Sequence, residues 1–329
     1  MRGIVVGNPG RDYKLTWARC PRPRPAQGQV LLEVAAAGVN RADLLQARGA
    51  YPPPEGASPL LGLECAGTVA ELGPGVEGWA VGDRAAALLP GGGYAQYAVA
   101  DSACLLPVPP GLDFAAAAAA PESACTVWSN LVEAGYRPGA ALLVHGGAGG
   151  IGTMAVKLGA AMGSPVFATA GSPQRARVCE ALGARRGIDY KSEDFAAVVL
   201  EGTAGAGVEV ILDVVGAAYL ERNLAALAAG GTLAVIGLMG GSRASLDLGR
   251  MLGRRHRIMA TSLRGRTRQD KARVVGQVRR DIWDLVAAGP SAPAAPVVGA
   301  HFPLPDAAAA HQAMKSGAVV GKIVLTSGR

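Results

Sequence analysis

The chain has 329 residues, enough for two domains that each bury a core, and half of its residues are hydrophobic although aromatics make up only 5%. No apolar run approaches the roughly 20 residues that a membrane-spanning helix requires, and the N-terminus lacks a signal-peptide pattern, so we expect a cytoplasmic protein without a membrane partner. The five cysteines lie far apart with no CxxC pair, which argues against a disulfide framework and a structural zinc site.

The net charge of +7 comes from one segment. Residues 250–280 hold eleven Lys or Arg and one acid, Asp270, which leaves 21 of the 32 bases and 24 of the 25 acids for the rest of the chain. Nucleic-acid binding would favour stacking aromatics or a known motif, and this segment has neither. A solvated basic face with one Arg near a cofactor is the favoured interpretation.

Residues 1–122 are predicted to form a compact β-rich barrel domain. Short β-like runs are separated there by glycine and proline, which are typical of tight connections. The runs cover residues 3–6, 29–35, 64–72, 84–89 and 96–100, and residues 40–46 resemble a short helix.

Residues 123–292 change to alternating helices and strands. A helix is predicted at 123–134, and strands at 142–144, 166–168, 187–189, 210–213 and 232–236. Repeated βα units with right-handed crossovers form a doubly wound parallel sheet, so the fold class is α/β with a ligand beyond the carboxyl ends of the strands. Residues 293–329 offer two strands and a helix, too little for a domain, and we expect this tail to return to the first one.

The segment ALLVHGGAGGIGT, residues 141–153, joins a buried strand to a helix through five glycines. Gly147, Gly149 and Gly152 match the GxGxxG spacing, in which the glycines permit a tight turn, backbone contact with a pyrophosphate and close packing of helix on strand. No Lys-Ser/Thr pair follows, so the pattern is not a Walker loop. The segment predicts a nicotinamide dinucleotide site at the N-terminus of the helix.

The next strand indicates which dinucleotide is bound. An NAD site usually carries Asp or Glu at the end of this strand, but here Gly171, Ser172, Pro173, Gln174 and Arg175 follow it. The hydroxyl of Ser172 and the guanidinium of Arg175 match a 2′-phosphate, which favours NADPH. The alternative is that Arg175 is a solvated residue on the following helix.

Segments along nearly the whole chain carry a family resemblance. They read GVNRADLLQARGAYPPP from Gly38, PLLGLECAGTVAELGPGV from Pro59, VGDRAAALLPGGGYAQY from Val81, AAAAAAPESACTVW from Ala115, VHGGAGGIG from Val144, TAGSPQRARVCEALGARRGIDY from Thr169, IGLMGG from Ile236 and AVVGKIVL from Ala318. Together they resemble the zinc-free medium-chain dehydrogenase/reductases, specifically the zeta-crystallin-like quinone oxidoreductases and their tumour-suppressor-induced branch.

The resemblance implies a GroES-like catalytic domain over residues 1–122, a Rossmann domain over 123–292 and a C-terminal return over 293–329. Zinc-dependent relatives place Cys near Asn40 and His after Gly62, where this chain has Val39, Asn40 and Leu63, so a tetrahedral zinc would lack its ligands. The implied activity is hydride transfer from NADPH to a quinone. Reduction of an enoyl or alkenal double bond, and a non-catalytic cofactor- or RNA-binding role, stay open as alternatives, and a homodimer is expected.

The resemblance also assigns site residues. Asn40 and Tyr51 would donate hydrogen bonds near the substrate oxygen, with the proton coming from Tyr51 or water; their alternatives are a helix cap and a rim aromatic. Tyr190 and Lys322 have structural alternatives as well. The implied cofactor residues are Thr126 near the nicotinamide amide, Gly147, Ala148, Gly149, Gly150 and Ile151 at the pyrophosphate, Ser172, Arg175 and Tyr190 at the 2′-phosphate and adenine, Gly237, Leu238, Met239, Ser262, Leu263 and Arg264 beside the nicotinamide half, and Gly321 and Lys322 on the terminal strand.

Overall fold

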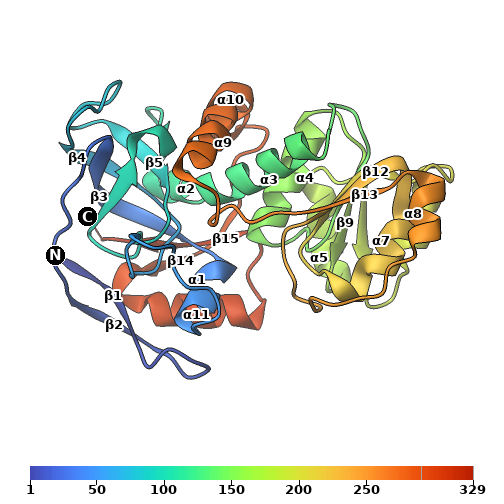
Figure 1. Cartoon of the computed structure of the whole chain (residues 1–329), viewed down its shortest axis with the longest axis horizontal. Coiled ribbons are helices and arrows are strands. Elements are labelled where there is room, and N and C mark those ends of the chain that lie inside the picture. Colours follow the sequence, from blue (N-terminus) through green and yellow to red (C-terminus); the bar gives the residue numbers. More distant parts are fainter. Residues whose placement is uncertain (290, 329) are drawn as a thin grey trace. The chain divides into compact units, whose positions relative to one another are not determined.

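The computed structural model describes residues 1–289 and 291–328. The chain folds into two units (Figure 1): unit 1 comprises Met1–Cys125 and Arg264–Arg329, and unit 2 comprises Thr126–Leu263. None of the helices in the described residues is both long enough and apolar enough to cross a membrane.

Strand β3 (Gln29–Val39) is the central element of unit 1, because it pairs with three other strands. Its first half pairs with β6 (Tyr97–Asp101) and its second half with β15 (Lys322–Thr326), while β4 (Glu64–Leu72) pairs along its other edge. The predicted β-rich domain is therefore confirmed. The sheet order is β14-β15-β3-β4-β5-β7, completed by β14 (Val298–Pro303), β5 (Arg84–Leu88) and β7 (Leu105–Pro107).

Small side chains let this sheet pack closely. The first alanines of the run that begins at Ala115 form the short helix α2 (Phe114–Ala118), which packs against β3 and β4. At Gly67 on β4, a Cβ would lie only 1.9 Å from the carbonyl oxygen of Glu33, so no other residue fits there without shifting the backbone. The abundance of Ala and Gly is thus a packing requirement of unit 1.

The other elements of unit 1 surround the sheet. Strands β1 and β2 form an antiparallel hairpin, and the helices include two turns of 3-10 type. Their bounds are β1 (Arg2–Gly7), β2 (Lys14–Arg19), α1 (Arg41–Ala47), η1 (Ser102–Cys104), α9 (Arg268–Asp281), α10 (Trp283–Ala287), η3 (Leu304–Asp306) and α11 (Ala307–Ser316).

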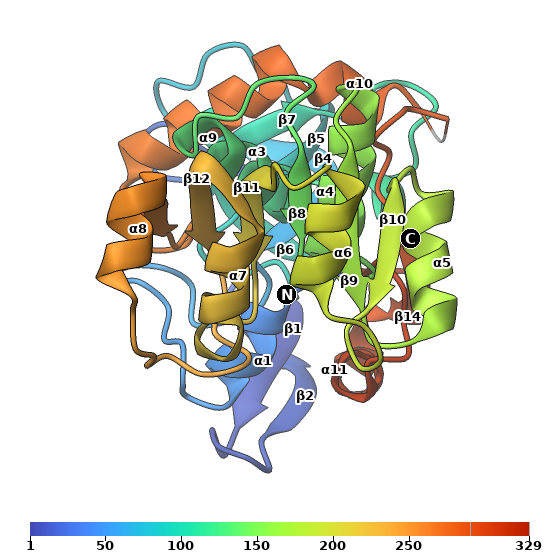
Figure 2. The same ribbon diagram turned by 90° about the vertical axis from the view of Figure 1, so that its right-hand side faces the viewer.

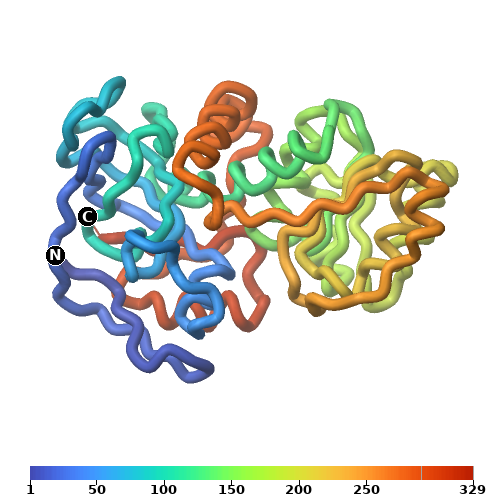
Figure 3. Tube along the Cα trace, viewed as in Figure 1, coloured from blue at the N-terminus to red at the C-terminus, as the bar shows by residue number. Residues whose placement is uncertain are grey.

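The C-terminal part of the chain belongs to unit 1 from Arg264 onward, whereas the sequence interpretation began this return at residue 293. Helices α9 and α10 account for the difference. The indole Nε1 of Trp283 donates to the carbonyl of Pro107 at 2.8 Å, and Arg268 pairs with Asp101. The orange and red trace of residues 264–328 accordingly lies with the blue and teal trace of unit 1 (Figure 3).

Unit 2 is a six-stranded parallel sheet in the order β10-β9-β8-β11-β12-β13. This confirms the predicted doubly wound fold, and the chain reverses direction across the sheet between β8 and β11, where such folds bind ligands. The strands are β8 (Leu142–Val144), β9 (Val166–Ala170), β10 (Arg186–Asp189), β11 (Val208–Asp213), β12 (Leu227–Val235) and β13 (Arg257–Ala260).

Helices cover the sheet of unit 2, and α6 and α7 lie on the near side of the strands in Figure 2. The buried apolar positions Phe167, Phe195 and Leu224 lie in one core cluster that joins helices to sheet. The helices are α3 (Pro121–Glu133), α4 (Gly150–Ala161), α5 (Pro173–Ala181), α6 (Phe195–Gly202), η2 (Ala217–Tyr219), α7 (Leu220–Ala226) and α8 (Leu248–Arg254).

Helix α8 and strand β13 form an apolar edge of unit 2. None of the seven residues of α8 is buried, and Leu248 and Leu252, four residues apart on one face, are 69% and 83% exposed. Strand β13 ends the sheet order and carries Ile258, also exposed. Leu248 and Leu252 thus form an exposed leucine ridge. In the described residues, no further strand pairs with β13, which directly follows this helix in the chain.

Candidate active site

The loop that follows β8 has the geometry expected of a dinucleotide-binding turn. A Cβ on Gly147 would lie 2.7 Å from the Cβ of Ala168, and one on Gly152 would lie 2.2 Å from the carbonyl oxygen of Gly146. Gly149 is the N-cap of α4, and its nearest neighbour for a Cβ is 3.4 Å away. Gly147 and Gly152 are thus needed for packing, whereas Gly149 keeps open the backbone at the helix N-terminus.

A chain of buried polar side chains supports this loop from below. Asp213 accepts from Asn223 Nδ2 at 3.1 Å, Asn223 Oδ1 contacts His145 Nε2 at 2.7 Å, and His145 Nδ1 contacts Thr169 Oγ1 at 3.0 Å. Because Asn223 Oδ1 only accepts, His145 carries its proton on Nε2 and accepts from the Thr169 hydroxyl. Thr169 Oγ1 in turn accepts from the backbone N–H of Gly146 at 3.3 Å. Burial lowers the pKa of His145 to about 4, so the ring is neutral at physiological pH.

The end of β9 brings together the three residues predicted at the 2′-phosphate and adenine. Ser172 is the N-cap of α5 and accepts from the backbone N–H of Arg175 at 3.3 Å. The guanidinium of Arg175 makes a long contact of 3.5 Å with the carbonyl of Ala148, which places it beside the glycine loop. The hydroxyl of Tyr190 lies over Gly171, only 3.1 Å from where a Cβ would stand. Hydroxyl, guanidinium and aromatic ring thus adjoin the same strand end.

The other predicted cofactor residues of unit 2 lie in different settings. Gly237 packs against Val214, where a Cβ would lie 2.8 Å from the Val214 carbonyl oxygen, while Leu238 and Met239 are exposed. Leu263 is buried, and Ser262 precedes it on the segment after β13. Thr126 lies in α3 and its carbonyl accepts from Asn130.

In unit 1, Asn40 is the N-cap of α1 and its carboxamide belongs to a buried ion pair. Its Nδ2 donates to Glu64 Oε1 at 2.8 Å, and its Oδ1 accepts from Lys322 Nζ at 2.6 Å. Lys322 also contacts Glu64 Oε1 at 2.5 Å, and the backbone N–H of Glu122 donates to Glu64 Oε2 at 2.8 Å. Glu64 and Lys322 are 0% and 3% exposed. Lys322, predicted beside the cofactor, therefore has its ammonium group engaged by Glu64 and Asn40, and Gly321 before it packs on Val297.

A second buried chain holds the turn on which Asn40 lies. Asp43 accepts from the backbone N–H of Asn40 at 2.8 Å and from that of Gly62 at 2.9 Å, and it accepts from the Tyr94 hydroxyl at 3.2 Å. Tyr94 also contacts His311 Nε2 at 3.4 Å. Burial raises the pKa of Asp43 to about 6, although these donors act in the opposite direction. The turn is thus fixed from two sides before any ligand binds.

Arg264 fixes the segment that carries Tyr51. Its Nη1 donates to the carbonyl of Tyr51 at 3.1 Å, its Nε to the carbonyl of Pro90 at 2.9 Å, and its Nη2 to Gln46 Oε1 at 2.7 Å. The guanidinium carbon lies 5.2 Å from the ring centroid of Tyr51, within the range of a cation–π contact. Arg264 was predicted beside the nicotinamide; the structure gives it a role in positioning Tyr51.

The side chains around Asn40 do not fit a metal ion. Leu63, at the position where zinc-dependent relatives would place His, is buried in the apolar core, and the Glu64 carboxylate is taken by Lys322. In residues 1–289 and 291–328 no group of three or more His, Cys, Asp or Glu side chains is placed to hold a metal. Within the described part of the chain, the side chains around Asn40 thus lack the soft or imidazole donors that zinc requires.

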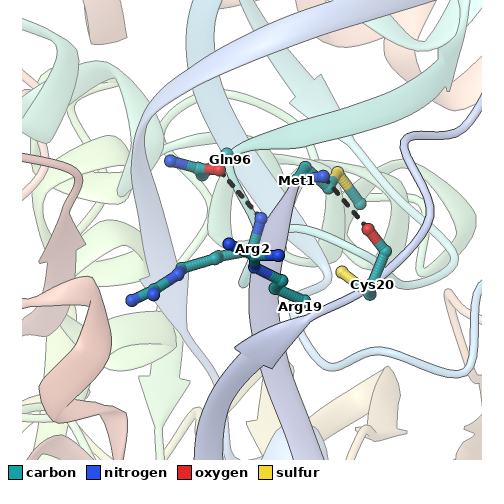
Figure 4. A pocket seen from close by; sticks show the side chains of 5 residues that line it. All are labelled: Met1, Arg2, Arg19, Cys20 and Gln96. Atoms are coloured by element: carbon teal, nitrogen blue, oxygen red, sulfur yellow. Dashed lines mark hydrogen bonds between the residues drawn. The ribbon is translucent and has the colours of Figure 1, made fainter.

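A cavity of about 450 Å³ lies elsewhere, on the N-terminal hairpin of unit 1 (Figure 4). It is lined by Met1, Arg2, Arg19, Cys20 and Gln96, and the Arg2 backbone N–H donates to Gln96 Oε1 at 2.8 Å. None of these residues takes part in the hydrogen bonds around Asn40 or the glycine loop. The cavity is therefore separate from the candidate site.

Sequence reasoning missed four residues that support the site: Glu64, Asp43, His145 and Asn223. The first two are acids in the segments that carry the family resemblance. Asp43 lies only three residues after the predicted donor Asn40, which was an available signal, whereas Glu64 lies 24 positions away. His145 and Asn223 are 78 positions apart in the chain. No pattern of spacing joins them.

Two family models match the chain, the alcohol dehydrogenase GroES-like domain over residues 26–110 and the zinc-binding dehydrogenase over residues 150–278. Among curated proteins, the phthioceranic/hydroxyphthioceranic acid synthase of Mycobacterium tuberculosis is 35% identical over 327 residues. That alignment covers 98% of this chain, but the chain spans only 15% of the length of the relative.

Solved structures match the chain over its whole length. A mycobacterial quinone oxidoreductase is 30% identical with a TM-score of 0.83, and the quinone oxidoreductase of Escherichia coli complexed with NADPH is 27% identical with a TM-score of 0.84; both alignments cover 99% of each chain. The CurK enoyl reductase is 27% identical with a TM-score of 0.83 over 99% of this chain and 98% of that one. These similarities support a nicotinamide cofactor.

The carboxyl of Glu122 gives this site a pH-dependent stability. Burial, and then the negative charge of Glu64, raise the pKa of Glu122 from 4.5 to about 8. The folded chain keeps a proton that the unfolded chain has released, so stability falls as pH rises through this window. Glu122→Gln has no such carboxyl. We therefore expect its free energy of unfolding, relative to that of the wild type, to rise by up to about 1.4 kcal/mol for each pH unit between about pH 4.5 and 8.

Urea unfolding at pH 5, 6.5 and 8 checks this expectation. Glu55→Gln, the same change at an exposed side chain, is the matched control. A stability difference between Glu122→Gln and the wild type that stays constant over the three pH values would contradict it.

Proposed function

The chain belongs to the medium-chain dehydrogenase/reductase family, and we propose that within this family it reduces quinones with NADPH and without a metal ion. The observation that carries the proposal is the setting of Asn40. Its carboxamide is held by a buried Glu–Lys ion pair, and the residues that the structure describes place no metal donor set around it. A quinone is already electrophilic and needs a hydrogen-bond donor at its oxygen more than a Lewis acid.

Unit 2 supplies the residues that would hold the cofactor. The backbone N–H groups of Gly150 and Ile151, in the first turn of α4, suit the pyrophosphate, and Ser172 and Arg175 suit the 2′-phosphate. NADPH, when bound, supplies the hydride. The exposed Met239 and Leu238 offer apolar surface for the nicotinamide half.

Unit 1 supplies the groups that act on the acceptor. Asn40 donates a hydrogen bond to the oxygen on which negative charge develops, and Tyr51 or water provides the proton. The contacts of Arg264 with the Tyr51 carbonyl and ring hold that aromatic residue in place. Reduction of an enoyl or alkenal double bond requires the same two acts, donation to an oxygen and protonation.

Enoyl reduction is the second candidate because of two relatives. The CurK enoyl reductase shares the fold over the whole chain, and the acid synthase of Mycobacterium tuberculosis is 35% identical. Both observations concern the relatives. They make the double-bond substrate the necessary comparison in any assay.

We expect NADPH oxidation with 9,10-phenanthrenequinone to exceed that with crotonyl-CoA, since the quinone already carries two activated carbonyl oxygens. Initial rates at 340 nm with either acceptor measure the preference. Asn40→Ala should slow the quinone reaction by about tenfold or more, the usual effect of removing a donor at a developing oxyanion. Turnover of the thioester with none of the quinone would overturn the proposal in favour of enoyl reduction.

Arg175 should determine the preference for the phosphorylated cofactor. Loss of a charge-assisted hydrogen bond of about 1.5–3 kcal/mol predicts that Arg175→Asp weakens NADPH binding by about tenfold or more and leaves NADH nearly unaffected. Fluorescence titrations with both cofactors provide the measurement. Arg177→Asp makes the same change of charge on the exposed side of the same helix and is the control. Equal NADPH affinities in the two variants would refute the assignment.

The edge of unit 2 fits a homodimer. Leu248 and Leu252 form an apolar ridge on a helix of which only Met251 packs against the core of unit 2. Strand β13 follows this helix in the chain and ends the described sheet order, and a second copy would cover both. Light scattering should give twice the 33.2 kDa of one chain, falling to one chain in Leu248→Asp/Leu252→Asp. Val81→Asp, at another exposed apolar residue, should remain dimeric. A monomeric wild type would contradict this arrangement.

A further inference from the structure

The hydrogen bonds of Asn40 determine which way its carboxamide faces. A lysine ammonium only donates and a carboxylate only accepts, so Oδ1 must face Lys322 and Nδ2 must face Glu64. Rotating the amide by half a turn would set its NH₂ against the ammonium and its oxygen against the carboxylate. One N–H of Nδ2 then remains beyond the one bound to Glu64, and its direction is fixed.

The surrounding strands are built to place this ion pair. Glu64 begins β4 and Lys322 begins β15, and these two strands flank the end of β3 that leads into Asn40. Gly38, two residues before Asn40, has no side chain where the carboxylate lies: a Cβ there would be 2.2 Å from Glu64 Oε1. The glycine, the acid and the lysine therefore form one arrangement on three neighbouring strands.

The pair is costly to bury unless every charge is satisfied. Both oxygens of Glu64 are used, one by Lys322 and Asn40 and the other by the backbone N–H of Glu122. Replacing such a pair by apolar residues is often neutral or stabilising, so stability alone does not explain why it is here. Its effect on Asn40 is specific, because it orients the amide and its ammonium polarises the amide carbonyl.

We propose that Glu64 and Lys322 are positioning residues, which hold Asn40 with one N–H directed for donation to the acceptor oxygen. The inference rests on the proposed function, because Asn40 must be the donor for its orientation to matter. It gives Lys322 a part in the hydride-transfer step and none in cofactor affinity.

The test is a double-mutant cycle between Lys322 and Asn40. Lys322→Met removes the charge and keeps the length of the side chain, and Asn40→Ala removes the donor. Each should slow single-turnover hydride transfer to 9,10-phenanthrenequinone by about tenfold or more. Because Lys322 acts through Asn40, the double variant should be no slower than Asn40→Ala alone. NADPH affinity, measured by fluorescence titration, should stay at the wild-type value in all three.

Two further variants separate positioning from folding. Lys322→Met leaves Glu64 buried without its counter-charge, so Lys322→Met/Glu64→Gln, which removes both charges, should fold and show the same slow hydride transfer. Lys315→Met, the same substitution at an exposed lysine of unit 1, should transfer hydride at the wild-type rate.

Four outcomes would overturn the inference. Rate losses that multiply in the double variant would mean that Lys322 acts independently of Asn40. Weaker NADPH binding with a normal rate at saturation would make Lys322 a cofactor-binding residue. A slow Asn40→Ala beside a normal Lys322→Met would overturn the inference alone, whereas an unchanged rate in Asn40→Ala would remove the proposed role of Asn40 as well.

Discussion

The ion pair of Glu64 and Lys322 is the constraint on which unit 1 depends. Two opposite charges with almost no solvent exposure are tolerated only where each finds its counter-charge and further hydrogen bonds. Meeting that requirement fixes a glycine at position 38 and the amide of Asn40 between the charges. It also ties the terminal strand β15 to β3 and β4, since Lys322 and Glu64 are 258 positions apart in the chain.

Unit 2 supports its own loop with a different kind of network. The chain from Asp213 through Asn223 and His145 to Thr169 holds one charge, at Asp213, and three neutral side chains. Burial lowers the pKa of His145 to about 4 and keeps the ring neutral, so the chain contains no positive charge opposite the carboxylate of Asp213. The same chain joins the end of β11 to the end of β8, the two strands between which the sheet order reverses. These hydrogen bonds therefore hold the glycine loop in place at the point where the cofactor phosphates would bind.

Local signals in the sequence were sufficient to predict several strands and the glycine loop. Strands 64–72 and 142–144 were predicted with the observed bounds, because runs of apolar residues ended at clear Gly or Pro signals. The role of Gly147 and Gly152 followed from their spacing, and the structure gives the close contacts that require them. These features depend on neighbours in the chain.

Features that depend on distant partners were not predictable. The sequence of α9 and α10 gives no indication of which unit these helices will cover. The contacts of Arg268 in α9 with the end of β6 and of Trp283 in α10 with β7 determine it. Strands β2 and β13 are short and lie at sheet edges, where burial leaves a weak pattern. Lys322 and Arg264 were predicted beside the cofactor, because the sequence does not show that each cation has acceptors within unit 1: Glu64 and Asn40 for Lys322, and the carbonyls of Pro90 and Tyr51 for Arg264.

The partners of Lys322 and Arg264 separate the roles that we propose for the two units. Lys322 is held by Glu64, and Arg264 by the carbonyls of Pro90 and Tyr51, so both cations contact the groups of unit 1 that are proposed to act on the acceptor. Among the residues predicted at the cofactor phosphates, Arg175 then supplies the positive charge, and it lies in unit 2 beside the glycine loop. Under the proposed function, cofactor affinity and donation to the acceptor would therefore depend on separate sets of charges. A substitution in one set is then expected to change NADPH affinity or the rate of hydride transfer without changing the other.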